Sequence, residues 1–114
     1  MFKYSEEDGA YLAELSGIEF VCEEPSGELE AAAKKLAELY EDRLPEIAAY
    51  ILPGLENMFE GLTVEKLIAD LGTPQIDLDV STITYLEQTL DESHIFTLEF
   101  DGAMEELLEF TVDG

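Results

Sequence analysis

The spacing of apolar residues changes twice along this chain, and these changes constrain its fold more than any other feature. Apolar and polar residues alternate over residues 9–24 and again over residues 76–112, which is the period of half-buried strands. Over residues 28–60 the apolar residues recur every three or four positions, as in an amphipathic helix. Strands, then helices, then strands again predict an α+β fold.

The first alternating stretch predicts a β-hairpin. Ser16-Gly17 separates its two runs and is a signal for a two-residue turn. Pro25-Ser26-Gly27 ends the second run. Cys22 is the only cysteine of the chain and lies in that run. We therefore expect a small buried hydrophobic residue there and no intramolecular disulfide.

The central stretch predicts three helices. Ser26 is placed to cap the first one, because its hydroxyl can accept from a free backbone amide. Pro45 favours the first turn of a second helix, and Pro53-Gly54 is expected to kink or interrupt that helix. A third, short helix is expected over residues 64–71, with Thr63 as its cap.

The C-terminal stretch predicts an antiparallel meander. Its strands are expected over residues 76–89, 95–100 and 108–112, with a bulge or bend at Ser81-Thr82 and turns at 91–93 and Asp101-Gly102. Residues 1–114 thus predict a single domain of the order β-β-α-α-α-β-β-β. We expect an antiparallel sheet of about five strands with helices packed on one face and water on the other.

Charge excludes several functions. The chain has 28 Asp and Glu against 5 Lys and Arg, a net charge of -23. Binding to a nucleic-acid backbone or to an anionic membrane needs cations, so neither is expected. From residue 67 to residue 114 there are twelve acids and no Lys or Arg, which makes the sheet portion the negative pole. No signal sequence or apolar run of about 18 residues is found, so a cytoplasmic protein is expected.

The residues offer little for catalysis or metal binding. His94 is the only histidine, and with a single cysteine it cannot form a zinc site of three or four ligands. A structural role is expected for it, with a contact to Asp91 and with Ser93 on the opposite face of the sheet. Asp77-x-Asp79 begins like a calcium loop, but the glycine and glutamate that such a loop needs later are missing. The sequence predicts no enzyme, no catalytic residue, no cofactor and no metal.

Three segments of the C-terminal half resemble a family: residues 71–76 (LGTPQI), 83–86 (ITYL) and 90–102 (LDESHIFTLEFDG). They resemble a group of short acidic bacterial proteins, uncharacterised domains of which some are grouped with the immunity proteins of toxin systems. The resemblance covers about a third of the chain. It implies a cytoplasmic, non-enzymatic α+β protein and assigns no functional residues.

The leading hypothesis is an acidic binding protein, of the kind of an immunity-type inhibitor, that covers a basic surface of a partner such as a toxin. Acids would steer the partner, and Tyr85 and His94 would serve as anchors. The predicted binding residues are Asp77, Asp79, Tyr85, Glu87, Asp91, Glu92, His94, Glu99 and Asp101. Two alternatives stay open: a structural or housekeeping domain whose acidity serves only solubility, and a mimic of nucleic acid. The sequence leaves the oligomeric state open.

Overall fold

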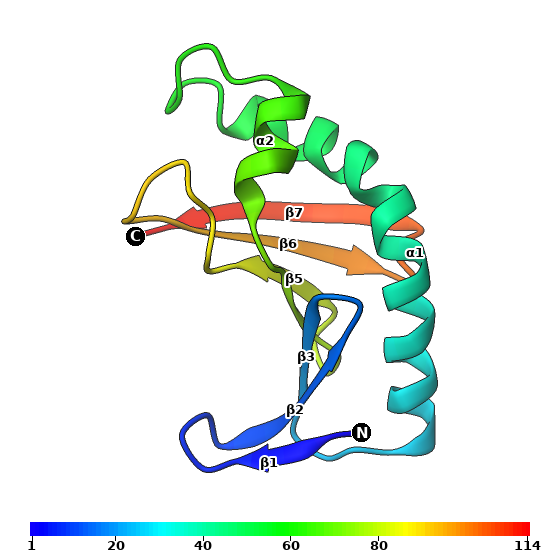
Figure 1. Cartoon of the computed structure of the whole chain (residues 1–114). Helices are drawn as coiled ribbons and strands as arrows, with labels where there is room; N and C mark the ends of the chain where they lie inside the picture. Colours follow the sequence, from blue (N-terminus) through cyan, green and yellow to red (C-terminus); the bar gives the residue numbers. More distant parts are fainter.

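A long helix, α1 (Gly27–Ile51), lies along one side of a seven-stranded sheet in the computed structural model, which describes residues 1–114 (Figure 1). The 3-10 helix η1 (Leu52–Gly54) follows it, and α2 (Val64–Leu71) packs against it. The strands are β1 (Lys3–Ser5), β2 (Ala10–Leu15), β3 (Ile18–Cys22), β4 (Gln75–Asp77), β5 (Thr82–Tyr85), β6 (Ile95–Asp101) and β7 (Glu106–Asp113). Neither α-helix combines the length and the apolar composition that crossing a membrane requires.

The strands lie in the sheet in the order of the chain, β1 to β7. Every neighbouring pair is antiparallel except β3 and β4, which are parallel because the two helices carry the chain back across the sheet between them. The predicted α+β class is confirmed. The prediction of about five antiparallel strands is wrong in detail. β1 has three residues and is too short for alternation to reveal. The single strand predicted over residues 76–89 is two strands, β4 and β5, because a turn at residues 78–81 divides it.

The predicted break at Pro45 is wrong. α1 continues through Pro45 and has 25 residues. Pro45 has no backbone N–H, so the helix loses one hydrogen bond there. Its side chain is exposed. The buried residues Ile47, Ala48 and Ile51 hold the following turns of α1 against the sheet, so the helix continues. The predicted interruption at Pro53-Gly54 is confirmed, since α1 ends at Ile51 and η1 ends at Gly54. Residues 55–61 then form turns and a bend where the sequence predicted helix.

The predicted helix caps are confirmed. The hydroxyl of Ser26 accepts from the backbone N–H of Leu29 at the start of α1, and that of Thr63 accepts from Lys66 at the start of α2. Gly72 ends α2 with φ 75°. A Cβ at Gly72 would lie 2.8 Å from the carbonyl oxygen of Glu87, so only glycine allows this close approach.

One row of residues runs across the sheet on the face that α1 covers. The strand register aligns Ala13, Phe20, Ile76, Ile83, Leu98 and Phe110, from β2 to β7. The first five are buried, and Phe110 packs against the same core. Because neighbouring residues of a strand point to opposite faces, this row fixes which side chains face away from α1.

A pair of buried tyrosines joins α1 to the sheet. The hydroxyl of Tyr40 lies 2.6 Å from the hydroxyl of Tyr85, and the two side chains are 7% and 0% exposed. The predicted role of Tyr85 as a partner anchor is therefore wrong. Its pairing with Phe96 directs the ring into the core, where no partner can reach it.

We expect the two tyrosine hydroxyls to be energetically coupled. Tyr85→Phe should lower the free energy of unfolding by about 1–2 kcal/mol, because it leaves the Tyr40 hydroxyl buried without a partner. The double variant Tyr40→Phe/Tyr85→Phe removes both hydroxyls and should lose less than the sum of the single losses. Urea unfolding of the four proteins measures this coupling, and additive losses would contradict it.

The same pair predicts unfolding at alkaline pH. Burial raises the pKa of Tyr40 to about 12 and that of Tyr85 well above its ordinary value of 10.0. An acid with a raised pKa in the folded state contributes stability below its unfolded pKa and loses it as pH rises through the folded pKa. We expect stability to fall from about pH 10 upward, and to fall less steeply in the Tyr40→Phe/Tyr85→Phe variant, as measured by tyrosinate absorbance and circular dichroism.

Candidate partner-binding face

The face of the sheet opposite α1 carries a continuous polar row. The register aligns Glu14, Glu19, Gln75, Thr84, Thr97 and Thr111 across β2 to β7. A second row on the same face aligns Lys3, Leu12, Val21, Asp77, Thr82 and Glu99 across β1 to β6. We call this surface the acidic face and define it by the carboxylates of Glu14, Glu19, Asp77, Glu87 and Glu99. Lys3, on the edge strand β1, is the only base that the strand register places on this face.

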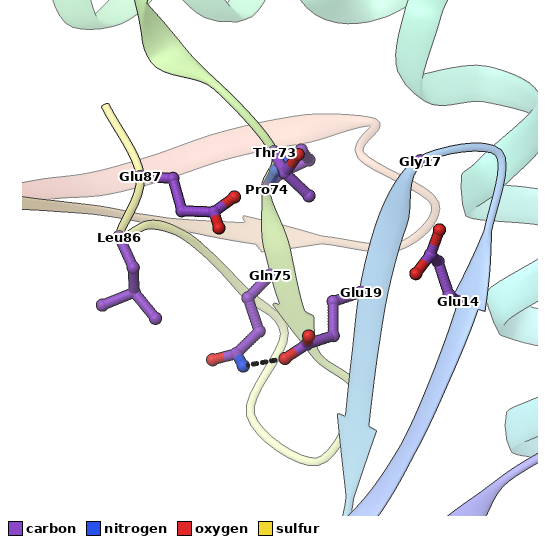
Figure 2. Close-up of a pocket in the computed structure, with 8 residues that line it drawn as sticks. All are labelled: Glu14, Gly17, Glu19, Thr73, Pro74, Gln75, Leu86 and Glu87. Carbon is purple, nitrogen blue, oxygen red and sulfur yellow. Dashed lines mark hydrogen bonds between the residues drawn. The ribbon is translucent and has the colours of Figure 1, made fainter. Parts of the chain in front are cut away.

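Three carboxylates of the acidic face surround one hollow. The first hollow has a volume of about 410 Å³ and is lined by Glu14, Gly17, Glu19, Thr73, Pro74, Gln75, Leu86 and Glu87 (Figure 2). The side-chain amide of Gln75 donates to Glu19 Oε1 over 2.5 Å. No Lys, Arg or His lines the hollow, so its three carboxylates have no cationic partner there.

A second hollow lies further along β3 and β4 and shares Gln75 with the first. It has a volume of about 320 Å³, and its acids are Asp8, Glu23, Asp77 and Asp79. Asp79 Oδ2 accepts from the backbone N–H of Glu23 over 2.8 Å, and Asp77 Oδ1 accepts from that of Asp79 over 2.9 Å. These bonds hold both predicted acids at the turn after β4.

The expectation for Cys22 is confirmed. Its side chain is 1% exposed and unpaired. Burial raises the pKa of the Cys22 thiol, and the carboxylates of Asp79 and Asp77 act in the same direction. The thiol is therefore kept protonated, as is typical of a structural cysteine.

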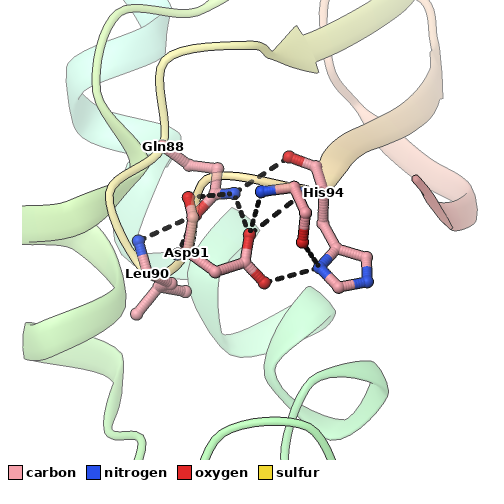
Figure 3. A network of polar contacts seen from close by, with 5 residues as sticks. Gln88, Leu90, Asp91 and His94 are labelled. Atoms are coloured by element: carbon pink, nitrogen blue, oxygen red, sulfur yellow. Dashed lines mark hydrogen bonds and ion pairs between the residues drawn. The ribbon is translucent and has the colours of Figure 1, made fainter.

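The connection between β5 and β6 is organised by one buried amide, Gln88, which is 7% exposed (Figure 3). Its Nε2 donates to the Asp91 carbonyl, to Asp91 Oδ1 and to the His94 carbonyl over 3.1, 2.9 and 2.9 Å. Its Oε1 accepts from the backbone N–H groups of Leu90 and Asp91. The backbone N–H of Thr89 donates to the Asp70 carbonyl over 2.7 Å, which ties this connection to α2.

The predicted contact between Asp91 and His94 is confirmed. Asp91 Oδ2 lies 2.5 Å from His94 Nδ1, and Asp91 Oδ1 accepts from the backbone N–H groups of Ser93 and His94. The hydrogen bond from Gln88, with those from His94 and Ser93, lowers the pKa of Asp91 to about 2. Asp91 is thus ionised at neutral pH and can only accept, so Nδ1 of His94 carries the proton.

Ser93 differs from the prediction. Its Oγ lies 3.2 Å from Nδ1 of His94 instead of on the opposite face, because Ser93 precedes β6 and does not follow strand alternation. Asp91 and Ser93 therefore approach the same ring nitrogen. A catalytic triad needs the acid on one ring nitrogen and the hydroxyl on the other, so these three residues do not form one.

The structure places most of the predicted residues around three adjoining hollows, of which the first shares Gln75 with the second and Leu86 with the third. Asp77 and Asp79 line the second hollow and Glu87 lines the first. Asp91, Glu92 and His94 line a third, of about 190 Å³. Glu99 is exposed on the acidic face, whereas Asp101 lies at the end of β6, where its side chain accepts from the Gly102 N–H.

Sequence reasoning missed Glu14, Glu19 and Gln75. The alternation over residues 9–24 already assigns the two glutamates to the polar side of a hairpin. Both glutamates lie outside residues 67–114, the base-free half to which the distribution of charge points. Only the parallel pairing of β3 with β4 places Glu19 beside Gln75, and no local pattern predicts that pairing.

Glu14 and Glu19 are direct cross-strand neighbours, and like charges in such pairs destabilise a sheet. Glu14→Gln is expected to raise the free energy of unfolding by about 0.5 kcal/mol, with the gain disappearing in about 1 M NaCl. Glu38→Gln on α1 is the control and should give no gain, since Lys34 and Lys35 precede it by one turn. Equal gains in thermal or urea unfolding would contradict a local repulsion.

No group of three or more His, Cys, Asp or Glu side chains is arranged to hold a metal ion. Comparison of the chain with family models, curated proteins and solved structures finds no match. The geometry and charge of the acidic face therefore provide the basis for inferring a function.

Proposed function

We propose that this is a non-enzymatic binding protein whose acidic face covers a basic surface of a partner protein, in the manner of an immunity-type inhibitor. The observation that carries the proposal is the first hollow, where Glu14, Glu19 and Glu87 converge without a cation. A hollow lined by one sign of charge focuses the field and speeds the capture of an oppositely charged partner. A toxin that grips nucleic-acid phosphates carries such a basic surface.

The close placement of like charges on the acidic face and around the second hollow supports a binding role. Glu14 faces Glu19 across β2 and β3, and Asp77 and Asp79 gather with Asp8 and Glu23 around the second hollow. Acidic residues that serve only solubility could be spread over the surface, which would avoid the repulsion between neighbouring carboxylates. Residues that lower stability and lie together are typical of functional surfaces.

The edges of the sheet are poorly suited to binding, which leaves its face. β1 has only three residues. β7 carries Glu106, Glu109 and Asp113, its register with β6 shifts beside Phe100, and the Tyr50 hydroxyl donates to the Leu108 carbonyl over 2.6 Å. Short strands, acidic side chains and irregular register all hinder the addition of another strand.

Two variants of equal net charge test the proposal. The face variant carries Glu14→Gln, Glu19→Gln and Glu87→Gln. The helix variant carries Glu28→Gln, Glu38→Gln and Glu41→Gln, all exposed on α1. Each is immobilised, exposed to lysate of the native host at low salt and eluted with rising salt, and the bound proteins are identified by mass spectrometry. We expect wild type and the helix variant to retain one basic protein that the face variant loses.

The alternative, acidity for solubility alone, predicts a different pattern. The three proteins would then retain the same broad set of basic proteins, or none, at every salt concentration. Either result would contradict a dedicated binding face, because net charge is the same in the two variants and only the position of the neutralised acids differs.

A further inference from the structure

One apolar side chain separates two acid-lined hollows. Leu86 lines the first hollow, beside Glu87, and the third hollow, beside Asp91 and Glu92. It is the only residue that these two hollows share, and it is 52% exposed. Figure 2 shows Leu86 at the border of the first hollow, on the side opposite the β2–β3 hairpin.

The position of Leu86 is fixed by its neighbours. Tyr85, immediately before it, is fully buried and paired with Phe96, and Gln88, two residues later, is held by the Asp91 and His94 bonds. The backbone on both sides is therefore anchored. A leucine held in this position offers apolar area that loses little conformational entropy on binding.

We propose, on the basis of the proposed function, that the partner binds through a basic amphipathic segment. An apolar side chain of that segment covers Leu86. Cationic side chains on either side of it enter the first and the third hollow. The carboxylates of the hollows favour cationic side chains over neutral ones. The contact at Leu86 would then form the apolar core of the interface, and the charged contacts in the hollows would surround it.

Val80 provides a matched control for this role. It is 63% exposed, more than Leu86, and lines neither of these hollows. It lies on the turn between β4 and β5. Exposure alone thus cannot explain a difference between Leu86→Ser and Val80→Ser in binding, because both changes replace an exposed apolar side chain by a polar one.

The test uses two blocked hexapeptides of equal charge. One has two leucines between two pairs of arginines, and the other has serines in place of the leucines. Binding is followed by NMR on isotope-labelled wild type, Leu86→Ser, Val80→Ser and the face variant. We expect the leucine peptide to bind wild type and Val80→Ser roughly three- to tenfold more tightly than the serine peptide. This advantage should disappear in Leu86→Ser and persist at higher salt, since it is not electrostatic.

Two outcomes would overturn the inference. Equal affinities of the two peptides for wild type would show that Leu86 is not an apolar contact, and so would a leucine advantage that survives Leu86→Ser. The proposed function is tested separately by the serine peptide. If that peptide binds the face variant as tightly as it binds wild type, the acidic face itself is not the binding surface.

Discussion

Replacing Gln88 by leucine is expected to lower the free energy of unfolding by about 3 kcal/mol. The change removes every side-chain hydrogen bond of this buried amide. The backbone donors of Leu90 and Asp91 and the carbonyl of His94 then lose a partner inside the connection between β5 and β6. Urea unfolding measures the loss, and Glu87→Gln, at the exposed position before it, is the control with little expected effect.

The same amide should control the titration of Asp91. The hydrogen bond from Gln88 is the largest cause of the lowered pKa of Asp91, about 2. A carboxyl with a depressed pKa contributes stability above its unfolded pKa, about 4, and loses it as pH falls through the folded value. In Gln88→Leu, NMR titration should find the pKa of Asp91 closer to its ordinary value. An unchanged pKa would contradict the role assigned to Gln88.

Ile76→Ala is expected to destabilise the protein by about 3–4 kcal/mol, in the upper part of the range for such truncations. Ile76 is 0% exposed and lies in the middle of the three-residue strand β4. It packs between Phe20 on β3 and Ile83 on β5 by register. β4 joins the N-terminal strands to the C-terminal ones, so the cavity weakens the only connection between them within the sheet.

Two further variants show whether the loss at Ile76 comes from the cavity. Ile76→Val removes a single methylene group and should cost about 1 kcal/mol. Val80→Ala, at a side chain that is 63% exposed, should have almost no effect. A loss at Ile76 no larger than that at Val80, measured by urea unfolding, would contradict the central position of β4.

The periodic parts of the fold could be predicted from the sequence. The alternation around Phe20 and Leu98 and the stripe of α1 depend on burial of one face, which leaves a repeating pattern. The conformation around Pro45 could not be predicted, because tertiary packing of the next turns outweighs one missing hydrogen bond. The three-residue strand β1 leaves no period, and the turn that divides β4 from β5 lies inside an alternating run. The parallel pairing of β3 with β4 is a long-range choice that no local signal encodes.

The candidate site could be predicted only in part. The distribution of charge, which a sequence shows directly, predicts Asp77, Glu87 and Asp91 as binding residues. The burial of Tyr85 depends on the register of β5 with β6, and the meeting of Glu19 with Gln75 depends on β4. Such juxtapositions arise from strand order, so a charge count alone cannot find them.

The position of a bound partner tests the central claim most directly. Hydrogen–deuterium exchange would be measured on the protein alone and with the basic protein retained in the capture experiment. We predict slower exchange in β3, β4 and residues 86–94, with the solvent side of α1 unchanged. Slower exchange on α1, with the acidic face unaffected, would contradict the account.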